Sequence, residues 1–196
     1  PKTTDFDLAT VELPAPGDGE VQVRNLWMSV DPYMRGRMYD RPSYVPPFQI
    51  GQALQGGAIG EVIASNDPDF KPGDIVNSMF GWREAFNAHP KSLAAAGMGA
   101  ITKVDTQGVP PQAFLGVAGM PGMTAYVGLL RVAALKDGDV VFVSAAAGAV
   151  GSIVCQIAKL KGHTVIGSAG GPEKVAFLKS IGVDHVIDYK ATPDVV

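Results

Sequence analysis

V-V-F-V-S-A-A-A-G-A-V-G, residues 140–151, is the stretch that decides the fold of this chain. Its four leading apolar residues predict a buried strand, and a tight turn of small residues follows. The next ten residues predict a helix that carries Ile153, Ile157 and Leu160 on one face. A strand, a glycine turn and a helix in this order aim free backbone N–H groups and the positive end of a helix at a phosphate. The stretch therefore predicts a nucleotide-binding turn.

The small residues of this turn are spaced as Ala145-x-x-Gly148-x-x-Gly151. Ala146 stands where the dinucleotide fingerprint G-x-G-x-x-G has its first glycine. Taken alone, this spacing also fits close packing of a helix on a strand in any α/β protein. The residues that follow favour the nucleotide-binding interpretation.

The segments after the turn continue an alternation of strands and helices. Thr164–Ser168 predicts a second strand, and a helix of about residues 173–181 precedes Gly182, which suits a helix C-cap. Residues 186–188 begin a third strand. Such alternation implies right-handed crossovers and a parallel sheet, hence a doubly wound dinucleotide-binding domain.

The end of the second predicted strand indicates which dinucleotide is bound. An NAD site usually has Asp or Glu there, but this chain reads G-S-A-G-G over residues 167–171 and has no carboxylate before Glu173. Lys174, in the first turn of the next helix, can meet a 2′-phosphate, and Gly170 and Gly171 allow close backbone approach. We therefore predict NADP(H) as cofactor. The alternative is that Lys174 is a solvated residue paired with Glu173.

Composition excludes several other function classes. The 196 residues are 46% hydrophobic and 18% charged, and the net charge of −3 argues against a nucleic-acid partner. No apolar run approaches the roughly 20 residues of a membrane span. The single cysteine, Cys155, excludes an internal disulfide and fits a reducing compartment, so we expect a cytoplasmic protein in which Cys155 is a core residue.

The N-terminal part predicts a different architecture. Short strands near residues 20–24, 60–64 and 74–80 are separated by Gly, Pro, Asp and Asn turns, which is typical of an antiparallel, barrel-like domain. A helical pattern follows from Gly119 to Leu130. We expect one domain over residues 1–115 and the first half of the dinucleotide-binding domain over residues 116–196.

The combined pattern resembles the medium-chain dehydrogenase/reductase superfamily. It is similar to the zinc-independent group that contains prostaglandin and leukotriene reductases, alkenal double-bond reductases and curcumin reductase. The resemblance rests on S-V-D-P-Y-M-R at 29–35, G-M-P-G-M-T-A-Y at 119–126, A-A-A-G-A-V-G-S at 145–152, E-K-V-A-F-L at 173–178 and D-Y-K at 188–190. It implies a GroES-like domain followed by a Rossmann domain.

The resemblance also implies site residues. The cofactor-contacting set is Thr124, Gly148, Ala149, Val150, Gly151, Ser152, Gly170, Lys174 and Tyr189. Tyr44 resembles a substrate-pocket tyrosine. The alternatives are that Thr124 is a residue of a helix N-terminus, that Tyr189 caps the third strand and that Tyr44 anchors a loop. We interpret Tyr33 and Arg35 as packing and ion-pairing residues beneath the pocket.

A zinc site is not predicted. Zinc needs three or four Cys, His or carboxylate ligands, and the chain has scattered His89, His163 and His185, for which surface or structural roles are expected. Zinc-dependent relatives carry G-H-E where residues 51–53 read G-Q-A, and a cysteine near Asp31.

The function implied is NADPH-dependent reduction of the C=C bond of α,β-unsaturated ketones or aldehydes, with the enolate held by hydroxyl donors. The alternatives are an NADPH quinone oxidoreductase and a non-catalytic NADP-binding protein. The catalytic proton donor is unknown, because the family's tyrosine would fall beyond Val196. The resemblance also implies a homodimer of the full-length protein.

Both ends of the chain suggest a fragment. The first residue is Pro1 rather than Met, so we expect the native N-terminus to be absent, which leaves a targeting segment open. A doubly wound domain has about six strands, and only three are predicted here.

Overall fold

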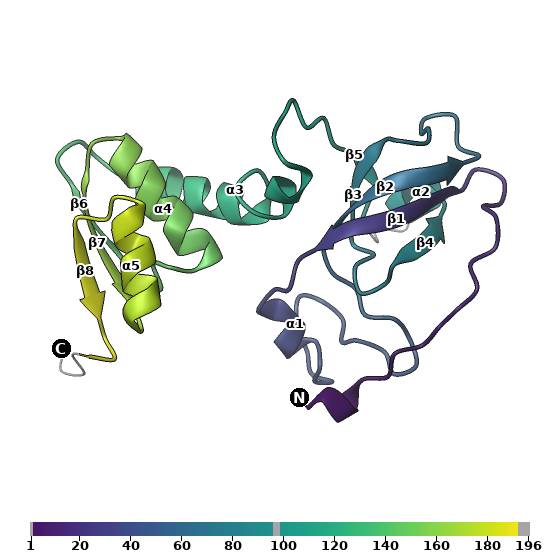
Figure 1. The fold of residues 1–196 in the computed structure, drawn as a ribbon, viewed down its shortest axis with the longest axis horizontal. Helices are drawn as coiled ribbons and strands as arrows, with labels where there is room; N and C mark the ends of the chain where they lie inside the picture. The colour runs from purple at the N-terminus through teal and green to yellow at the C-terminus, as the bar shows by residue number, and fades with distance from the viewer. Residues whose placement is uncertain (1, 96–98, 192–196) are drawn as a thin grey trace. The chain divides into compact units, whose positions relative to one another are not determined.

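The computed structural model describes residues 2–95 and 99–191. The chain divides into two compact units, Pro1–Gln112 and Ala113–Val196, each with its own architecture (Figure 1).

The first unit is built on a five-stranded sheet in the order β4-β1-β2-β3-β5, in which every neighbouring pair is antiparallel. The strands are β1 (Val21–Met28), β2 (Ala58–Ser65), β3 (Ile75–Ser78), β4 (Ala85–Ala88) and β5 (Thr102–Lys103). Short helices α1 (Tyr33–Gly36) and α2 (Pro90–Ala95) lie between them, with 3₁₀ turns η1 (Thr3–Asp5) and η2 (Pro111–Leu115) near the ends of the unit. The predicted antiparallel, β-rich domain is confirmed.

Buried and less buried side chains alternate along the strands, and the buried ones form the core of this unit. Val21 and Val23 of β1 are fully buried together with Val62 of β2 and Val76 of β3, and Phe86 of β4 joins them. Side chains two residues apart share one face of a strand, so these residues form a single apolar layer.

The second unit contains a three-stranded parallel sheet in the order β6-β7-β8. After the end of η2, which crosses the boundary between the units, come α3 (Met120–Val127) and the π-helical turn η3 (Gly128–Val132). Then β6 (Val140–Val143), α4 (Ala149–Leu160), β7 (Thr164–Ala169), α5 (Pro172–Ser180) and β8 (His185–Asp188) alternate along the chain. The predicted β-α-β-α-β order of a half Rossmann sheet is confirmed.

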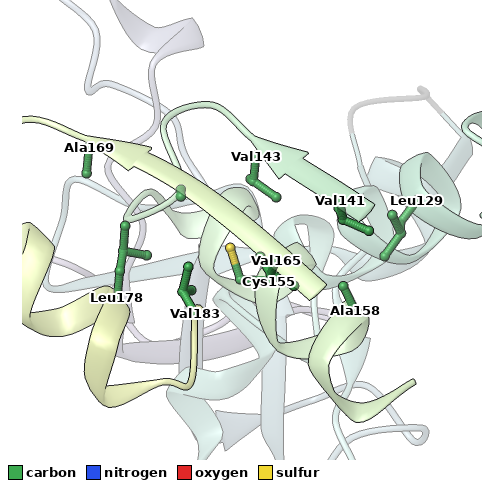
Figure 2. Packing of buried hydrophobic residues seen from close by; sticks show 10 residues of the cluster. Leu129, Val141, Val143, Cys155, Ala158, Val165, Ala169, Leu178 and Val183 are labelled. Carbon is green, nitrogen blue, oxygen red and sulfur yellow. The ribbon is translucent and has the colours of Figure 1, made fainter. Parts of the chain in front are cut away.

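One face of this sheet carries the core (Figure 2). Val141 and Val143 of β6 and Val165 of β7 pack with Cys155 and Ala158 of α4, and α5 adds its buried Leu178. Cys155 is fully buried, as predicted for a core residue.

The expectation of a buried strand at residues 140–143 is wrong for two of the four residues. Val140 and Phe142 are 60% and 61% exposed, because side chains alternate between the two faces of β6 and only Val141 and Val143 face the core cluster. In α4 the buried positions are Cys155 and Ala158, and Leu160 is 88% exposed.

Glycines end both helices that follow the strands. Gly162 and Gly182 have φ values of +84° and +86°, a conformation that glycine adopts without strain. The N–H of Gly182 donates to the carbonyl of Lys179, and that of Val183 donates to the carbonyl of Leu178. This is the hydrogen-bond pattern of a Schellman motif, and it confirms the predicted role of Gly182.

Among the described residues, no helix combines the length and the apolar character that crossing a membrane requires.

Candidate functional site

The glycine turn leads from β6 to the open N-terminus of α4. Gly148 is the N-cap, with φ −79° and ψ 172°, and no side chain caps the helix there. The N–H of Ser152 donates to the carbonyl of Gly148 at 3.0 Å, and this is the first i→i−4 hydrogen bond of the helix. The preceding N–H groups of Ala149, Val150 and Gly151 therefore lie at an uncapped helix end, where an anion is stabilised.

Close packing fixes the shape of this turn. A Cβ atom on Gly151 would lie 2.5 Å from the carbonyl oxygen of Ala145 and 2.9 Å from the Cα of Ala146, both backbone atoms. The N–H of Ala146 donates to the carbonyl of Ser168 at 2.9 Å, which joins the turn to β7. The packing interpretation of the small residues thus holds alongside the nucleotide-binding one.

A groove of about 710 Å³ opens beside the turn. Its lining joins Thr124 of α3 to β6 and to Gly148, Val150 and Gly151. Thr124 is the fifth residue of α3 and its hydroxyl donates to the carbonyl of Met120 at 2.7 Å. The alternative that Thr124 belongs to a helix N-terminus is therefore wrong.

A second cluster lies where β7 and β8 end. Gly171 is the N-cap of α5 with φ +99°, and its N–H donates to Oδ1 of Asp188 at 3.0 Å. The N–H of Lys190 donates to the same oxygen. The hydrogen bond from Gly171 lowers the pKa of the Asp188 carboxyl, which keeps it ionised. A Cβ on Gly170 would lie 2.7 Å from Cζ of Tyr189, so that ring packs on Gly170.

Lys174 projects from the first turn of α5 with an exposed side chain. Within residues 2–95 and 99–191 it forms no ion pair, so the alternative pairing with Glu173 is not observed. Because β6, β7 and β8 are parallel, the glycine turn and the segments around Gly170 and Tyr189 lie at the same carboxyl edge of the sheet.

In the first unit, Tyr44 is 85% exposed and lies in a shallow pocket formed by its own segment, residues 40–47. Arg37 fastens that segment. Its Nε donates to the carbonyl of Pro46 at 2.8 Å and its Nη2 to Oε1 of Gln55 at 3.0 Å, and its guanidinium lies 4.2 Å from the centre of the Phe48 ring. The loop that carries Tyr44 is therefore anchored by Arg37 through the carbonyl of Pro46.

The structure draws attention to Tyr33, which the sequence analysis interpreted only as a packing residue beneath the pocket. Its hydroxyl is buried and finds no hydrogen-bond partner among the described residues. Burial raises the pKa of this hydroxyl, and the charge of Asp31 adds to the effect. An orphaned buried hydroxyl is a donor available to a ligand. Its position in the S-V-D-P-Y-M-R motif was the signal that could have found it.

Arg35 was expected to form an ion pair, and none is observed in the described part of the chain. Its guanidinium instead donates to the hydroxyl of Tyr39 and lies 4.6 Å from the centre of that ring.

The described residues contain no cluster of three or more His, Cys, Asp or Glu side chains that could hold a metal ion. Nδ1 of the buried His163 lies 3.0 Å from the carbonyl oxygen of Asp139, which is a structural role. His89 immediately precedes α2, and His185 is exposed at the start of β8. The absence of zinc from the whole protein stays a prediction.

Comparison with known families matches both parts of the chain. Residues 1–96 match a family model described as the N-terminal domain of oxidoreductase. Residues 149–196 match a model described as zinc-binding dehydrogenase.

Individual relatives are similar over nearly the whole chain. The NADPH-dependent curcumin reductase of Escherichia coli is 41% identical over 97% of this chain and 53% of its own length. The 2-alkenal reductase (NADP(+)-dependent) of Nicotiana tabacum is 43% identical over 99% of this chain and 56% of its own. The crystal structure of CurA in complex with NADPH from Vibrio vulnificus is 44% identical with a TM-score of 0.85, over 97% of this chain and 54% of that one.

The chain thus spans about half the length of the relatives that it matches. The two family models, the relatives and the half Rossmann sheet agree with one another and with the sequence motifs. The chain therefore belongs to the medium-chain dehydrogenase/reductase family.

Proposed function

We propose that this chain is the substrate domain and the first half of the cofactor domain of an NADPH-dependent reductase. The reaction proposed is reduction of the C=C bond of α,β-unsaturated ketones and aldehydes. The observation that carries the proposal is the carboxyl edge of β6, β7 and β8, where an uncapped helix end and Lys174 are available to phosphates. The names of the curcumin and alkenal reductases support the substrate class.

The residues at this edge fit NADPH. The N–H groups of Ala149, Val150 and Gly151, with Ser152 beside them, would hold the pyrophosphate. Gly148 allows its close approach, and Thr124, which lines the same groove, would contact the nicotinamide.

The segments that follow β7 and β8 fit the adenosine end. Lys174 would pair with the 2′-phosphate, and Gly170 and Tyr189 would form the surface beside it. The loop after β7 offers no carboxylate before Glu173, which disfavours the 2′-hydroxyl of NAD as the group recognised there. When bound, NADPH supplies the hydride that the reduction consumes.

Hydroxyl groups in the first unit would hold the oxygen of the substrate. Hydride addition to the β-carbon of an enone moves negative charge to the carbonyl oxygen, and a hydrogen-bond donor stabilises that charge. The hydroxyl of Tyr33, which has no partner in the part of the chain that the structure describes, is such a donor, and Tyr44 is the exposed candidate on the neighbouring loop. We assign residues 1–115 to substrate binding and residues 116–196 to cofactor binding.

The test is turnover by the full-length protein, followed through the loss of NADPH absorbance. We expect consumption of NADPH with an aliphatic enone, a saturated ketone as product by mass spectrometry, and much weaker activity with NADH. Turnover of quinones but not enones would favour the quinone oxidoreductase alternative. NADPH binding without turnover of either class would favour a non-catalytic protein, and failure to bind NADPH would refute the proposal.

We further propose that the full-length protein is a cytoplasmic homodimer that acts on small molecules. The dimer rests on the family resemblance, and the single buried Cys155 is consistent with a reducing compartment. Sedimentation equilibrium of the full-length protein tests the dimer, and fractionation of source cells tests the location.

A further inference from the structure

Trp82 occupies a strained turn between β3 and β4. Its φ of +61° lies in the left-handed region, which is a genuine outlier for a bulky residue. Glycine adopts this conformation without steric penalty, so a simple connection between the two strands does not require tryptophan.

Two polar side chains hold the turn in place. Nδ2 of Asn25 donates to the carbonyl of Phe80 at 2.7 Å and to that of Arg83 at 2.8 Å, one on each side of Trp82. The Arg83 guanidinium donates to the carbonyl of Gly81 at 3.2 Å and to that of Leu54 at 2.9 Å. These bonds fix the backbone on both sides of the strained residue.

The turn also rests on a glycine of the preceding segment. The N–H of Gly81 donates to the carbonyl of Gly56 at 2.9 Å, and Gly56 forms a bridge with Phe80. A Cβ on Gly81 would lie only 2.9 Å from the Gly56 oxygen. The strained conformation is therefore over-determined by its surroundings, the condition under which such strain persists at functional sites.

Core packing does not explain the tryptophan. Trp82 is 41% exposed, and it belongs to neither hydrophobic core cluster, although its neighbour Phe80 packs on the core of the first unit. A Cβ built on Gly56 would lie 3.5 Å from the indole Nε1 and 2.4 Å from Cε of Met34. The indole and the Met34 side chain thus both lie next to Gly56, and part of the indole surface is open to solvent.

We propose that Trp82 is a specificity-determining residue of the substrate site, whose exposed indole contacts the flat apolar group conjugated to the C=C bond. This inference rests on the proposed reductase function. Aromatic rings stack in offset or edge-to-face arrangements and gain affinity beyond the area that they bury, so the effect should be largest for aryl enones.

The test compares variants of the full-length protein with 4-phenyl-3-buten-2-one and 3-penten-2-one. Trp82→Gly removes the indole and relieves the backbone, Trp82→Phe keeps a ring, and Trp27→Phe is the matched control. Trp27 is also about half exposed but lies in the regular strand β1. We expect Trp82→Gly to raise KM for the aryl enone about 10-fold, the scale of one aromatic contact, with partial restoration in Trp82→Phe.

The same variant should leave KM for 3-penten-2-one, the NADPH affinity and the Trp27→Phe control unchanged, and its melting temperature should not fall. An equal rise of KM for both enones, or a loss of thermal stability with no change in their ratio, would overturn the inference and show a structural role.

A binding measurement separates this inference from the proposed reaction. The aryl enone should quench tryptophan emission in the parent and in Trp27→Phe, and the quenching should be lost in Trp82→Phe. If quenching follows this pattern but no enone is turned over, the reductase proposal fails while the binding role of Trp82 stands. Equal quenching in Trp82→Phe and the parent would overturn the role of Trp82.

Discussion

Lys174 is the residue on which the choice of cofactor depends. It lies three positions after the N-cap Gly171, so its exposed ammonium and the positive end of α5 favour an anion in the same place. A phosphate on the ribose offers that anion, whereas a free 2′-hydroxyl does not. The charge of one side chain therefore distinguishes the two dinucleotides.

We predict that Lys174→Ala weakens NADPH binding by about 1.5–3 kcal/mol, the range for hydrogen bonds to charged groups, and leaves NADH binding almost unchanged. Isothermal titration calorimetry with both dinucleotides measures the difference. Lys179→Ala is the matched control, because Lys179 lies in the last turn of the same helix. An equal loss of affinity for both cofactors would contradict the assignment.

The residues proposed for the nucleotide site were accessible to sequence reasoning because their geometry is local. Gly148 and Gly151 belong to one strand–turn–helix unit, and their spacing predicts the turn that the structure contains. The hydroxyl of Tyr33, which has no hydrogen-bond partner in the described residues, was not predicted because its burial depends on the surrounding chain, which no local spacing reveals. The strained φ of Trp82 was not predicted because Asn25, which holds the turn, precedes it by 57 positions.

At the scale of elements, one ion pair joins α4 to the segment between α5 and β8. Nζ of Lys159 lies 2.7 Å from Oδ1 of Asp184 and also donates to the carbonyl of His163. Oδ2 of Asp184 accepts the N–H of Val165 in β7 at 2.7 Å. Lys159, first among the causes, and the Val165 N–H lower the pKa of the Asp184 carboxyl. The carboxylate of Asp184 thus ties the segment between α5 and β8 to both α4 and β7.

We predict that the second unit loses stability as the pH falls below about 4, the ordinary pKa range of aspartate. A carboxyl whose pKa is lower in the folded state contributes its full stability above the unfolded pKa and loses it as the pH falls through the folded one. Asp184→Asn should reduce this pH dependence, and Asp137→Asn, a matched change in the turn before β6, should not. Urea unfolding between pH 6 and pH 2.5 measures the free energy of unfolding at each pH. The same change of that free energy with pH in the parent and in Asp184→Asn would contradict the prediction.

The elements that sequence patterns missed are those with little local signal. The predicted strands match β1, β2 and β3 within a few residues, but β4 and β5 were not predicted. β4 has four residues and pairs with β1 across more than sixty positions, and β5 has two residues. Tertiary pairing, rather than propensity, makes these segments strands.

At the scale of the whole molecule, two separate hydrophobic clusters lie one in each unit. Every residue proposed to hold the cofactor belongs to the second unit. A ligand that binds only the folded state stabilises what it binds, by about 2.7 kcal/mol at a concentration of 100 times Kd.

We therefore predict that NADPH slows hydrogen exchange in this chain mainly over residues 140–190 and leaves the β1–β4 region almost unchanged. Exchange followed by mass spectrometry with and without NADPH measures the pattern, and NADH at the same concentration is the control. Protection concentrated in β1, β2 and β4 would contradict the assignment of the cofactor to the second unit.

Cys155 gives the second unit a built-in reporter. It is the single cysteine of the chain, its side chain is fully buried between α4 and the sheet, and burial raises the pKa of its thiol. A thiol reagent added to the native chain can react with Cys155 only when α4 separates from the strands. The rate of labelling therefore reports how often this opening occurs. The opening of this half of the molecule can thus be timed without introducing any substitution or dye.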